Sequence, residues 1–143
     1  MALATGSAIA VYDTAVTAIS DASAIAAAGF NAGTITAVTN TAPLANAVLN
    51  VTMALAPVAG DAFHLYRRDL NISGINDATV PSAGYKNIYV GSFPLALVIT
   101  QQFISLPDIP LSGDQEFYIE NDSGQSTSGT TVLTITPKSF NAA

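Results

Sequence analysis

The stretch Thr131-Val132-Leu133-Thr134-Ile135-Thr136 alternates threonine with apolar residues and is followed by Pro137. Alternation with a period of two is typical of a β-strand that buries one of its faces. Threonine, valine and isoleucine also favour strands. Because proline lacks the backbone donor that a central strand needs, we expect this strand to stop at Pro137. The segment predicts a β protein.

Four other segments in the second half of the chain have the same character. They are rich in aromatic or β-branched residues and are bounded by Gly, Pro, Asn or Asp: Ala62–Arg68, Asn87–Phe93, Gln102–Leu106 and Glu116–Glu120. Short strands separated by frequent turn signals indicate a sandwich or a barrel. In the first half, Gly33–Thr39 and Ala47–Leu55 are further predicted strands. We therefore predict an all-β fold, an antiparallel β-sandwich of jelly-roll-like or Greek-key topology.

The segment Asp13–Ala28 permits two interpretations. Asp13 and Gly29 would suit the start and the end of a helix, and many alanines lie between them. However, the segment also contains several β-branched residues and is interrupted by Ser and Asp, which lowers its helix propensity. We favour strand–turn–strand and keep the helix as the alternative.

The chain has 143 residues, a length that suits one domain. By count, 16 of its 25 alanines lie in the first fifty residues, whereas nearly all aromatic residues follow Gly60. A layer of small side chains can pack against a layer of large ones in one core. We expect a single domain over residues 1–143, a turn at Pro57–Gly60, and an N-terminal arm over residues 1–9 that a partner orders.

The composition excludes several classes of protein. The sequence has no Cys, so it has neither disulfides nor Cys-ligated metal. With four basic residues and a net charge of -6, it is a poor candidate for electrostatic nucleic-acid binding. It contains no apolar stretch long enough to span a bilayer and begins without a signal-peptide pattern. We expect a protein made in the cytoplasm, with neither nucleic acid nor membrane as its partner.

Only 10% of the residues are charged, against a norm of about 25%. The surface must therefore consist largely of Ala, Thr, Ser, Asn and Gly, and such surfaces lose little side-chain entropy on contact. Scarcity of lysine is also a trend of interface cores. This favours a homo-oligomer, the alternative being a monomer with a neutral surface.

No cluster of residues in the sequence predicts catalysis. His64 is the only histidine, and no Gly-x-Ser-x-Gly motif accompanies it, so we expect a histidine on a strand face with a local hydrogen bond. Adjacent strand residues point to opposite faces, so Arg67 and Arg68 cannot clamp one anion together. We expect a structural ion pair there, for instance with Asp69.

Two acidic patterns also fall short of a site. Asp69–Gly74 and Asp77 partly match a calcium loop, but Val80 stands where the bidentate Glu belongs. Glu116 and Glu120 share a strand face about 13 Å apart, at ~3.3 Å per residue, which is too far for a glycosidase pair. They lie between Asp114 and Asp122, and together these acids indicate a solvated or subunit-facing edge. We predict no catalytic, cofactor-binding or metal site and no cofactor.

From about Asn50 to Asn141 the chain resembles small structural proteins of tailed bacteriophages. The resemblance rests on five segments: Leu65–Ile72, Tyr85–Phe93, Ser105–Leu111, Glu116–Asn121 and Thr134–Lys138. It implies a non-enzymatic β-sandwich built into the virion, such as a decoration (cement) protein on the outer capsid surface. Such a protein would bind and bridge major capsid subunits, and we expect it to be a trimer. Ala2–Ile9 and Asn71–Tyr85 are the expected interface segments.

Two alternatives remain open at this point. Tyr66, Tyr85, Tyr89 and Tyr118 could form a stacking platform for sugars, which would make the chain a carbohydrate-binding module on the virion. The other alternative is a structural subunit of the tail, the neck or the fibre base.

Overall fold

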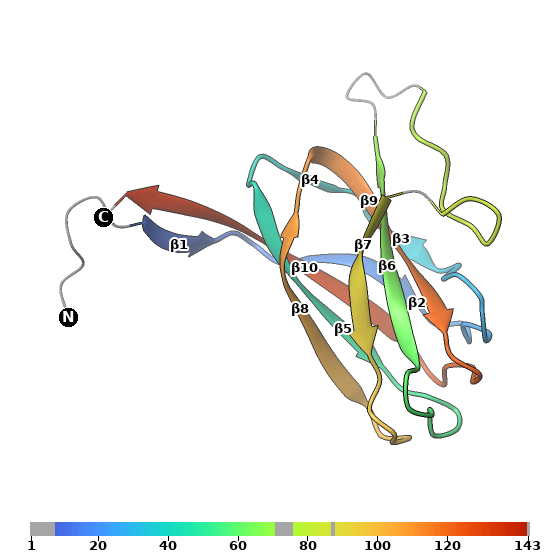
Figure 1. Cartoon of the computed structure of the whole chain (residues 1–143). Helices are drawn as coiled ribbons and strands as arrows, with labels where there is room; N and C mark the ends of the chain where they lie inside the picture. Colours follow the sequence, from blue (N-terminus) through green and yellow to red (C-terminus); the bar gives the residue numbers. More distant parts are fainter. Residues whose placement is uncertain (1–7, 71–75, 87, 143) are drawn as a thin grey trace, which may run out of the picture.

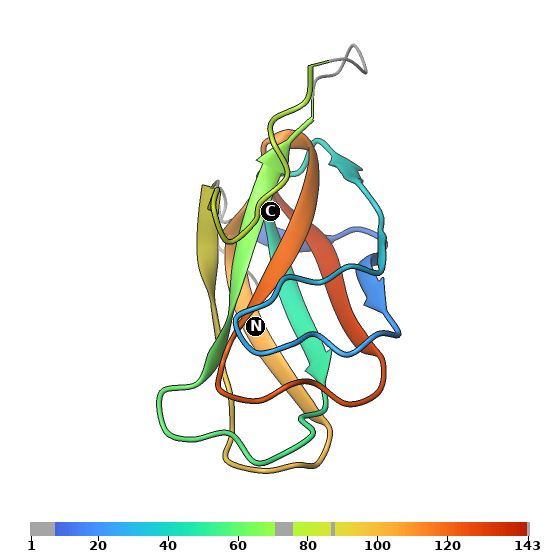
Figure 2. The same ribbon diagram turned by 90° about the vertical axis from the view of Figure 1, so that its right-hand side faces the viewer.

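The computed structural model describes residues 8–70, 76–86 and 88–142. These residues form ten β-strands and no helix, arranged as two antiparallel sheets that pack against each other (Figures 1 and 2). The six-stranded sheet contains β1 (Ala8–Tyr12), β2 (Val16–Asp21), β3 (Thr34–Ile35), β5 (Leu44–Val51), β8 (Gln102–Pro110) and β10 (Thr131–Ala142). The four-stranded sheet contains β4 (Val38–Asn40), β6 (Ala62–Asp69), β7 (Ile88–Pro94) and β9 (Gly113–Asp122). The predicted β-sandwich is confirmed.

The strand order is β3-β2-β10-β5-β8 in one sheet and β4-β9-β6-β7 in the other. The chain crosses between the sheets at most of its connections, among them β3 to β4, β5 to β6 and β7 to β8. Crossing connections are common to jelly-roll and Greek-key sandwiches. They interleave distant parts of the sequence in one core.

Small and large side chains divide between the two layers of the core. Ala18, Ala45 and Ala47 are fully buried on β2 and β5 of the six-stranded sheet, whereas three fully buried phenylalanines, Phe63, Phe93 and Phe117, belong to the four-stranded sheet. Close packing requires large groups to face small ones. The predicted division into a small N-terminal layer and a large C-terminal layer is correct only in part. The six-stranded sheet includes β8 and β10 from the second half of the chain and also buries Ile19, Leu49, Leu133 and Ile135.

The prediction that the last strand stops at Pro137 is wrong, because β10 continues to Ala142. Pro137 lies where the partner of β10 changes, since Ile135 pairs with Val16 of β2 and Lys138 pairs with Tyr12 of β1. Its carbonyl accepts a hydrogen bond from the backbone N–H of Asp13, in the link between β1 and β2. On a strand the missing N–H would point to this same side, where no ladder is continued, so the proline is tolerated.

Three other boundaries differ from the sequence prediction. Gly33–Thr39 is not one strand but two, β3 and β4, which belong to different sheets. The strand predicted over Ala47–Leu55 is shifted to Leu44–Val51. β8 passes through Pro107, where it was expected to end, with Asp108 at a positive φ of 56°. As an edge strand it can hold a proline without losing an inner ladder bond.

The segment Asp13–Ala28 contains no helix. It forms β2 and then an irregular stretch that ends in an isolated bridge between Phe30 and Glu120. The favoured strand–turn–strand is therefore correct for its first half only. The irregular stretch is held by side chains: Asn121 Nδ2 donates to the carbonyls of Ile25 and Ala26, and Asn31 Oδ1 accepts from the N–H of Ile119.

Candidate functional site

The outer face of the four-stranded sheet carries two similar polar groups, each built from a glutamate, a tyrosine and a base. On one side, Glu116 accepts hydrogen bonds from Tyr118 (2.6 Å) and from Arg68 (2.7 Å). Four residues further along β9, Glu120 accepts one from Tyr66 (3.0 Å) and pairs with Lys86 (2.7 Å). The two glutamates share a face, as predicted, and each has its own partners. The predicted edge is wrong, because β9 lies between β4 and β6 and Glu120 is only 5% exposed.

The pKa values of these groups reflect their burial and their partners. Burial, followed by the hydrogen bond to Glu116, raises the pKa of Tyr118 to about 12. The same two causes, with Glu120 as partner, raise the pKa of Tyr66. The hydrogen bond to Glu116 raises the pKa of Arg68. Each carboxylate thus stabilises the protonated form of its neighbours, which suits a structural network.

His64 lies beside this network on β6. Its Nε2 is 2.8 Å from Asp122 Oδ2, and its Nδ1 is 2.8 Å from Ser92 Oγ, which in turn is 2.7 Å from the hydroxyl of Tyr89. A proton on Nε2 donated to Asp122 leaves Nδ1 to accept from Ser92. The predicted local hydrogen bond is present, and the histidine makes two.

Ser, His and Asp are also the residue types of a hydrolase triad. In such a triad the acid is buried and the serine sits on a sharp turn. Here the Asp122 side chain is 65% exposed and Ser92 lies inside strand β7. We therefore interpret the chain Tyr89–Ser92–His64–Asp122 as a structural network across β7, β6 and β9.

The four tyrosines proposed as a sugar platform are not equivalent. Tyr66 and Tyr118 are each only 5% exposed, whereas Tyr85 and Tyr89 are 49% and 55% exposed. The ring of Tyr66 contacts those of Phe30 (5.6 Å) and Tyr89 (5.8 Å). Two of the four rings therefore offer little surface for stacking.

Phe30 reaches Tyr66 because the loop between β2 and β3 is held in place by Asp21. This carboxylate is 1% exposed and accepts hydrogen bonds from the N–H groups of Ser23 (2.9 Å) and Ala32 (2.8 Å). A buried carboxylate needs such partners.

Arg67 and Arg68 point to opposite faces, as predicted. Arg68 joins the network around Glu116, whereas Arg67 donates to the carbonyl of Pro110 on the other sheet and pairs with Asp69 at 3.0 Å. Lys138 pairs with Asp108, so every Lys and Arg of the chain has an acidic partner.

The partial calcium loop is not assembled in the described part of the chain. Asp69 is engaged by Arg67 and by the hydroxyl of Ser112, and residues 71–75 lie outside the described residues. Among the residues that the structure describes, no group of three or more His, Cys, Asp or Glu is placed to hold a metal ion.

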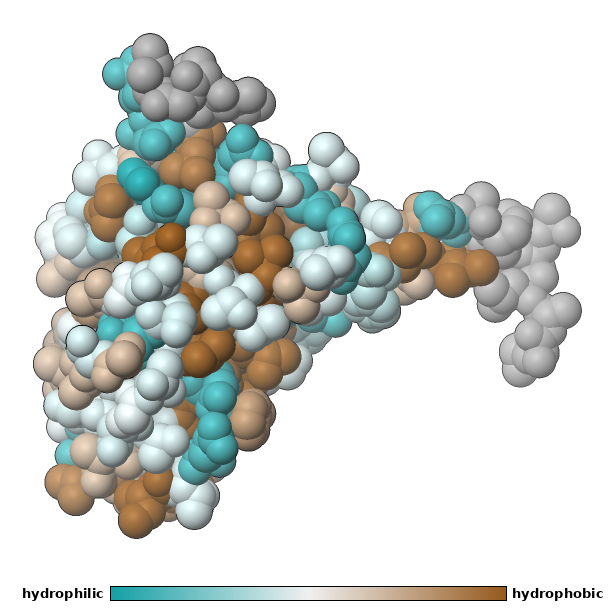
Figure 3. Space-filling view, turned by 180° about the vertical axis from the view of Figure 1, so that it is seen from behind, coloured by the Kyte–Doolittle hydropathy of each residue, from teal (hydrophilic) through white to brown (hydrophobic). Residues whose placement is uncertain are grey.

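The outer face of the six-stranded sheet has the opposite character. We call eight of its outward side chains on β2, β5 and β10 the neutral face: Thr17, Ser20, Asn46, Val48, Asn50, Val132, Thr134 and Thr136. None of these eight side chains is charged. Lys138, the next outward residue of β10, pairs with Asp108 at the end of this face near the arm. Figure 3 views this side, and much of the body there has the pale colours of residues that are neither strongly hydrophilic nor strongly hydrophobic.

Beyond the neutral face, β1 and the end of β10 pair as a two-stranded ribbon that projects from the body (Figure 1). We call this ribbon, Ala8–Tyr12 with Ser139–Ala142, the arm. All of β1 is exposed, and the arm shows Ile9, Val11, Tyr12 and Phe140 to solvent. Of the predicted arm over residues 1–9, only Ala8 and Ile9 fall within the described residues.

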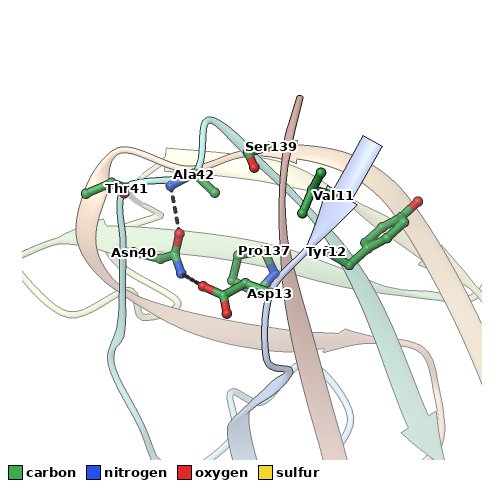
Figure 4. Close-up of a pocket in the computed structure, with 8 residues that line it drawn as sticks. All are labelled: Val11, Tyr12, Asp13, Asn40, Thr41, Ala42, Pro137 and Ser139. Carbon is green, nitrogen blue, oxygen red and sulfur yellow. Dashed lines mark hydrogen bonds between the residues drawn. The ribbon is translucent and has the colours of Figure 1, made fainter. Parts of the chain in front are cut away.

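The base of the arm is fixed to the body around a pocket of ≈ 280 Å³ (Figure 4). Asp13 accepts hydrogen bonds from the N–H of Thr14 (2.7 Å) and from Asn40 Nδ2 (2.9 Å), and these lower the pKa of its carboxyl. Asn40 Oδ1 in turn accepts from the N–H of Ala42 (2.7 Å). These bonds set the direction in which the arm leaves the body.

Of the second predicted interface segment, Asn71–Tyr85, the structure describes residues 76–85, which lie between β6 and β7. Its described part contacts the body where Arg68 donates to the carbonyl of Ala78 (3.0 Å).

Among the described residues, no helix has the length and apolar character needed to cross a membrane.

The C-terminal half of the arm and the neutral face were not predicted from the sequence. The outward residues of β5 and of β10 up to Thr136 are Thr, Asn and Val, but the sequence does not show that these two strands are neighbours. The second strand of the arm was not predicted, because Pro137 indicated the end of a strand.

Comparison with models of protein families and with curated proteins finds no match to this chain.

Proposed function

We propose that the chain is a non-enzymatic structural subunit of a tailed-bacteriophage virion, a decoration protein that binds major capsid subunits on the outer surface of the shell. The observation that carries the proposal is the sorting of charge between the two outer faces. The neutral face has no charged side chain, whereas Arg68, Glu116, Glu120 and Asp122 gather on the opposite face.

A neutral face suits attachment to a repeating lattice. Thr, Ser and Asn make hydrogen bonds without the desolvation cost of burying a charge. They also lose less side-chain entropy than Lys, Arg or Glu when they are immobilised. A trimer would make several such contacts at once, so weak individual contacts would suffice to hold it and to bridge neighbouring capsid subunits.

The ion pairs of the chain also fit this proposal. With each base already engaged by an acid and a net charge of -6, the subunit has little attraction for DNA during assembly. The face that carries the pairs of Arg68 and Lys86 would look outward from the shell.

The test is co-sedimentation of the purified protein with empty shells of the major capsid protein encoded by the same virus. We expect saturable retention on the shells. The double variant Val48→Glu with Thr134→Glu places two charges on directly paired residues of the neutral face and should reduce retention at least tenfold. Ile88→Glu is the matched control, because Ile88 is 38% exposed and Val48 is 36% exposed.

Failure of the wild-type protein to sediment with shells at tens of micromolar would contradict the proposal. Equal losses in the double variant and in the control would contradict the role of the neutral face.

A carbohydrate-binding module is the second candidate, supported by the exposed rings of Tyr85 and Tyr89. Binding on a glycan array that is lost in Tyr89→Ala would favour it. A tail, neck or fibre-base subunit would bind those assemblies and not shells.

A further inference from the structure

Two apolar surfaces of this chain lie at opposite ends of the six-stranded sheet. One is the arm. The other, which we call the apolar corner, is formed by the loop between β7 and β8 and the start of β8: Leu97, Val98, Ile99 and Phe103, which are 56%, 42%, 58% and 67% exposed. Monomeric proteins rarely leave such groups of large apolar side chains in water without a function.

The strand directions place these surfaces apart. β10 is antiparallel to β5, and β5 is antiparallel to β8, so β10 and β8 run the same way. Phe103 lies at the start of β8, whereas Pro110, at its end, pairs with Leu44, the neighbour of Lys138 at the base of the arm. The eight residue steps from Gln102 to Pro110 span about 26 Å, at ~3.3 Å each.

The arm continues β10 beyond this end and away from the apolar corner (Figure 1). It therefore does not fold back onto the apolar corner of its own molecule. A contact between the two surfaces has to join two molecules.

The arm also needs a partner. An isolated two-stranded ribbon is marginal in water, and stable sheets need a third strand or an apolar cover. Beyond Lys138, where the pairing of β10 with Leu44 of β5 ends, the pairings found in the described residues give β10 a neighbour on the β1 side only. Both a free backbone edge and exposed apolar side chains are thus available on the arm.

The distribution of charged side chains indicates that the partner of the arm is a second copy of the chain. The protein carries a net charge of -6, so two copies can approach closely only through surfaces that lack charge. The sequence has no charged side chain between Met1 and Tyr12, between Ser139 and Ala143, or between Leu95 and Pro107. The arm and the apolar corner are both apolar, and they can meet without bringing like charges close together.

We propose that the arm of one copy packs on the apolar corner of a second copy of this chain. The contact is heterologous, because it joins two different surfaces. Contacts of this kind close into a ring when the rotation between copies permits it, and three copies would make the expected trimer. The inference rests on the chain's own geometry and does not depend on a shell as partner.

Light scattering of the purified full chain tests it. We expect the wild-type protein to show a multiple of 14.6 kDa at about 100 µM. Ile9→Asp with Phe140→Asp disables the arm, and Ile99→Asp disables the apolar corner, so each variant should be monomeric. Ile88→Asp, on the first residue of β7, is the control and should keep the wild-type mass.

Mixing the two disabled variants is the decisive experiment. Each disabled variant keeps one intact surface, so an equimolar mixture of the two should form pairs of twice 14.6 kDa, although each alone is a monomer. A mixture that stays monomeric overturns the proposal, and so does a wild-type monomer. Equal loss of assembly in Ile88→Asp also overturns it.

Hydrogen exchange on the wild-type protein keeps the proposal testable if a variant fails to fold. Backbone amides of Ala8–Tyr12 and of Leu97–Phe103 should both become more protected as the concentration rises from about 1 to 100 µM. Protection that rises in one segment without the other contradicts a contact between them.

Discussion

At the scale of single residues, two buried tyrosines take part in the ion-pair network on the four-stranded sheet. Tyr118 and Tyr66 are each 5% exposed, and each donates its phenol to a glutamate of β9. Hydrogen bonds to charged groups typically contribute about 1.5–3 kcal/mol to stability. The bond from Tyr66 to Glu120 joins β6 to β9, whereas the bond from Tyr118 lies within β9 and supports the carboxylate that pairs with Arg68.

Tyr118 should make stability fall at alkaline pH. Its pKa is raised to about 12 in the folded protein from an ordinary value of 10.0. A raised pKa means that its contribution is fully present below pH 10 and is lost as the pH rises through about 12. Urea denaturation of the wild-type protein should therefore show a decline over this window that is weaker in Tyr118→Phe. Parallel declines in the two proteins would exclude Tyr118 as the cause.

Below pH 9, Tyr118→Phe should lower the free energy of unfolding by about 1–2 kcal/mol, because Glu116 keeps Arg68 as a partner after the phenol is lost. Tyr85→Phe is the control, since Tyr85 is 49% exposed. No change in Tyr118→Phe would show that the bond to Glu116 contributes nothing.

The Ser92–His64–Asp122 chain gives a second prediction at this scale. We expect no labelling of Ser92 by a fluorophosphonate, since Asp122 is largely in water and Ser92 also bonds to Tyr89. His64→Ala should change stability by about 1 kcal/mol and leave any esterase background unaltered. Stoichiometric labelling that disappears in His64→Ala would instead identify a nucleophile.

At the scale of strands and loops, sequence patterns predicted the strands that alternate or carry aromatic residues, among them β6, β7 and β9. They failed where a strand boundary depends on pairing with strands that are distant in the sequence. Pro137 is tolerated because β10 changes its partner there, and no property of the residues around it in sequence reports that exchange. Gly33–Thr39 divides between two sheets because the chain crosses over at this point.

Gly33, directly before β3, packs closely against β2. A Cβ there would lie 2.4 Å from both the Ser20 carbonyl oxygen and the Asp21 Cα, closer than atoms can approach. Gly33→Ala should therefore destabilise the fold by about 1–3 kcal/mol, the usual cost of overpacking. Gly124→Ala, which has nothing within 4 Å of its Cβ, should be close to neutral. Thermal denaturation of the two variants measures the difference.

At the scale of the whole molecule, the protein is a sandwich with two unlike faces and an arm at one end. The scarcity of charge predicted an interaction surface, and the structure shows where charge is missing: on the neutral face, along the arm and at the apolar corner. The sequence could not assign the surfaces, because outward residues of β2, β5 and β10 become neighbours only through the strand order. For the same reason, Ser92, His64 and Asp122 were not recognised as a group.

The salt dependence of shell binding tests the central claim, attachment through the neutral face, most directly. Contacts without charge are not screened, so the affinity of the protein for empty shells should change less than twofold between 50 mM and 1 M NaCl. Electrostatic attachment through the face of Arg68, Glu116 and Glu120 would weaken at high salt. A loss of affinity of tenfold or more over this range would contradict the account.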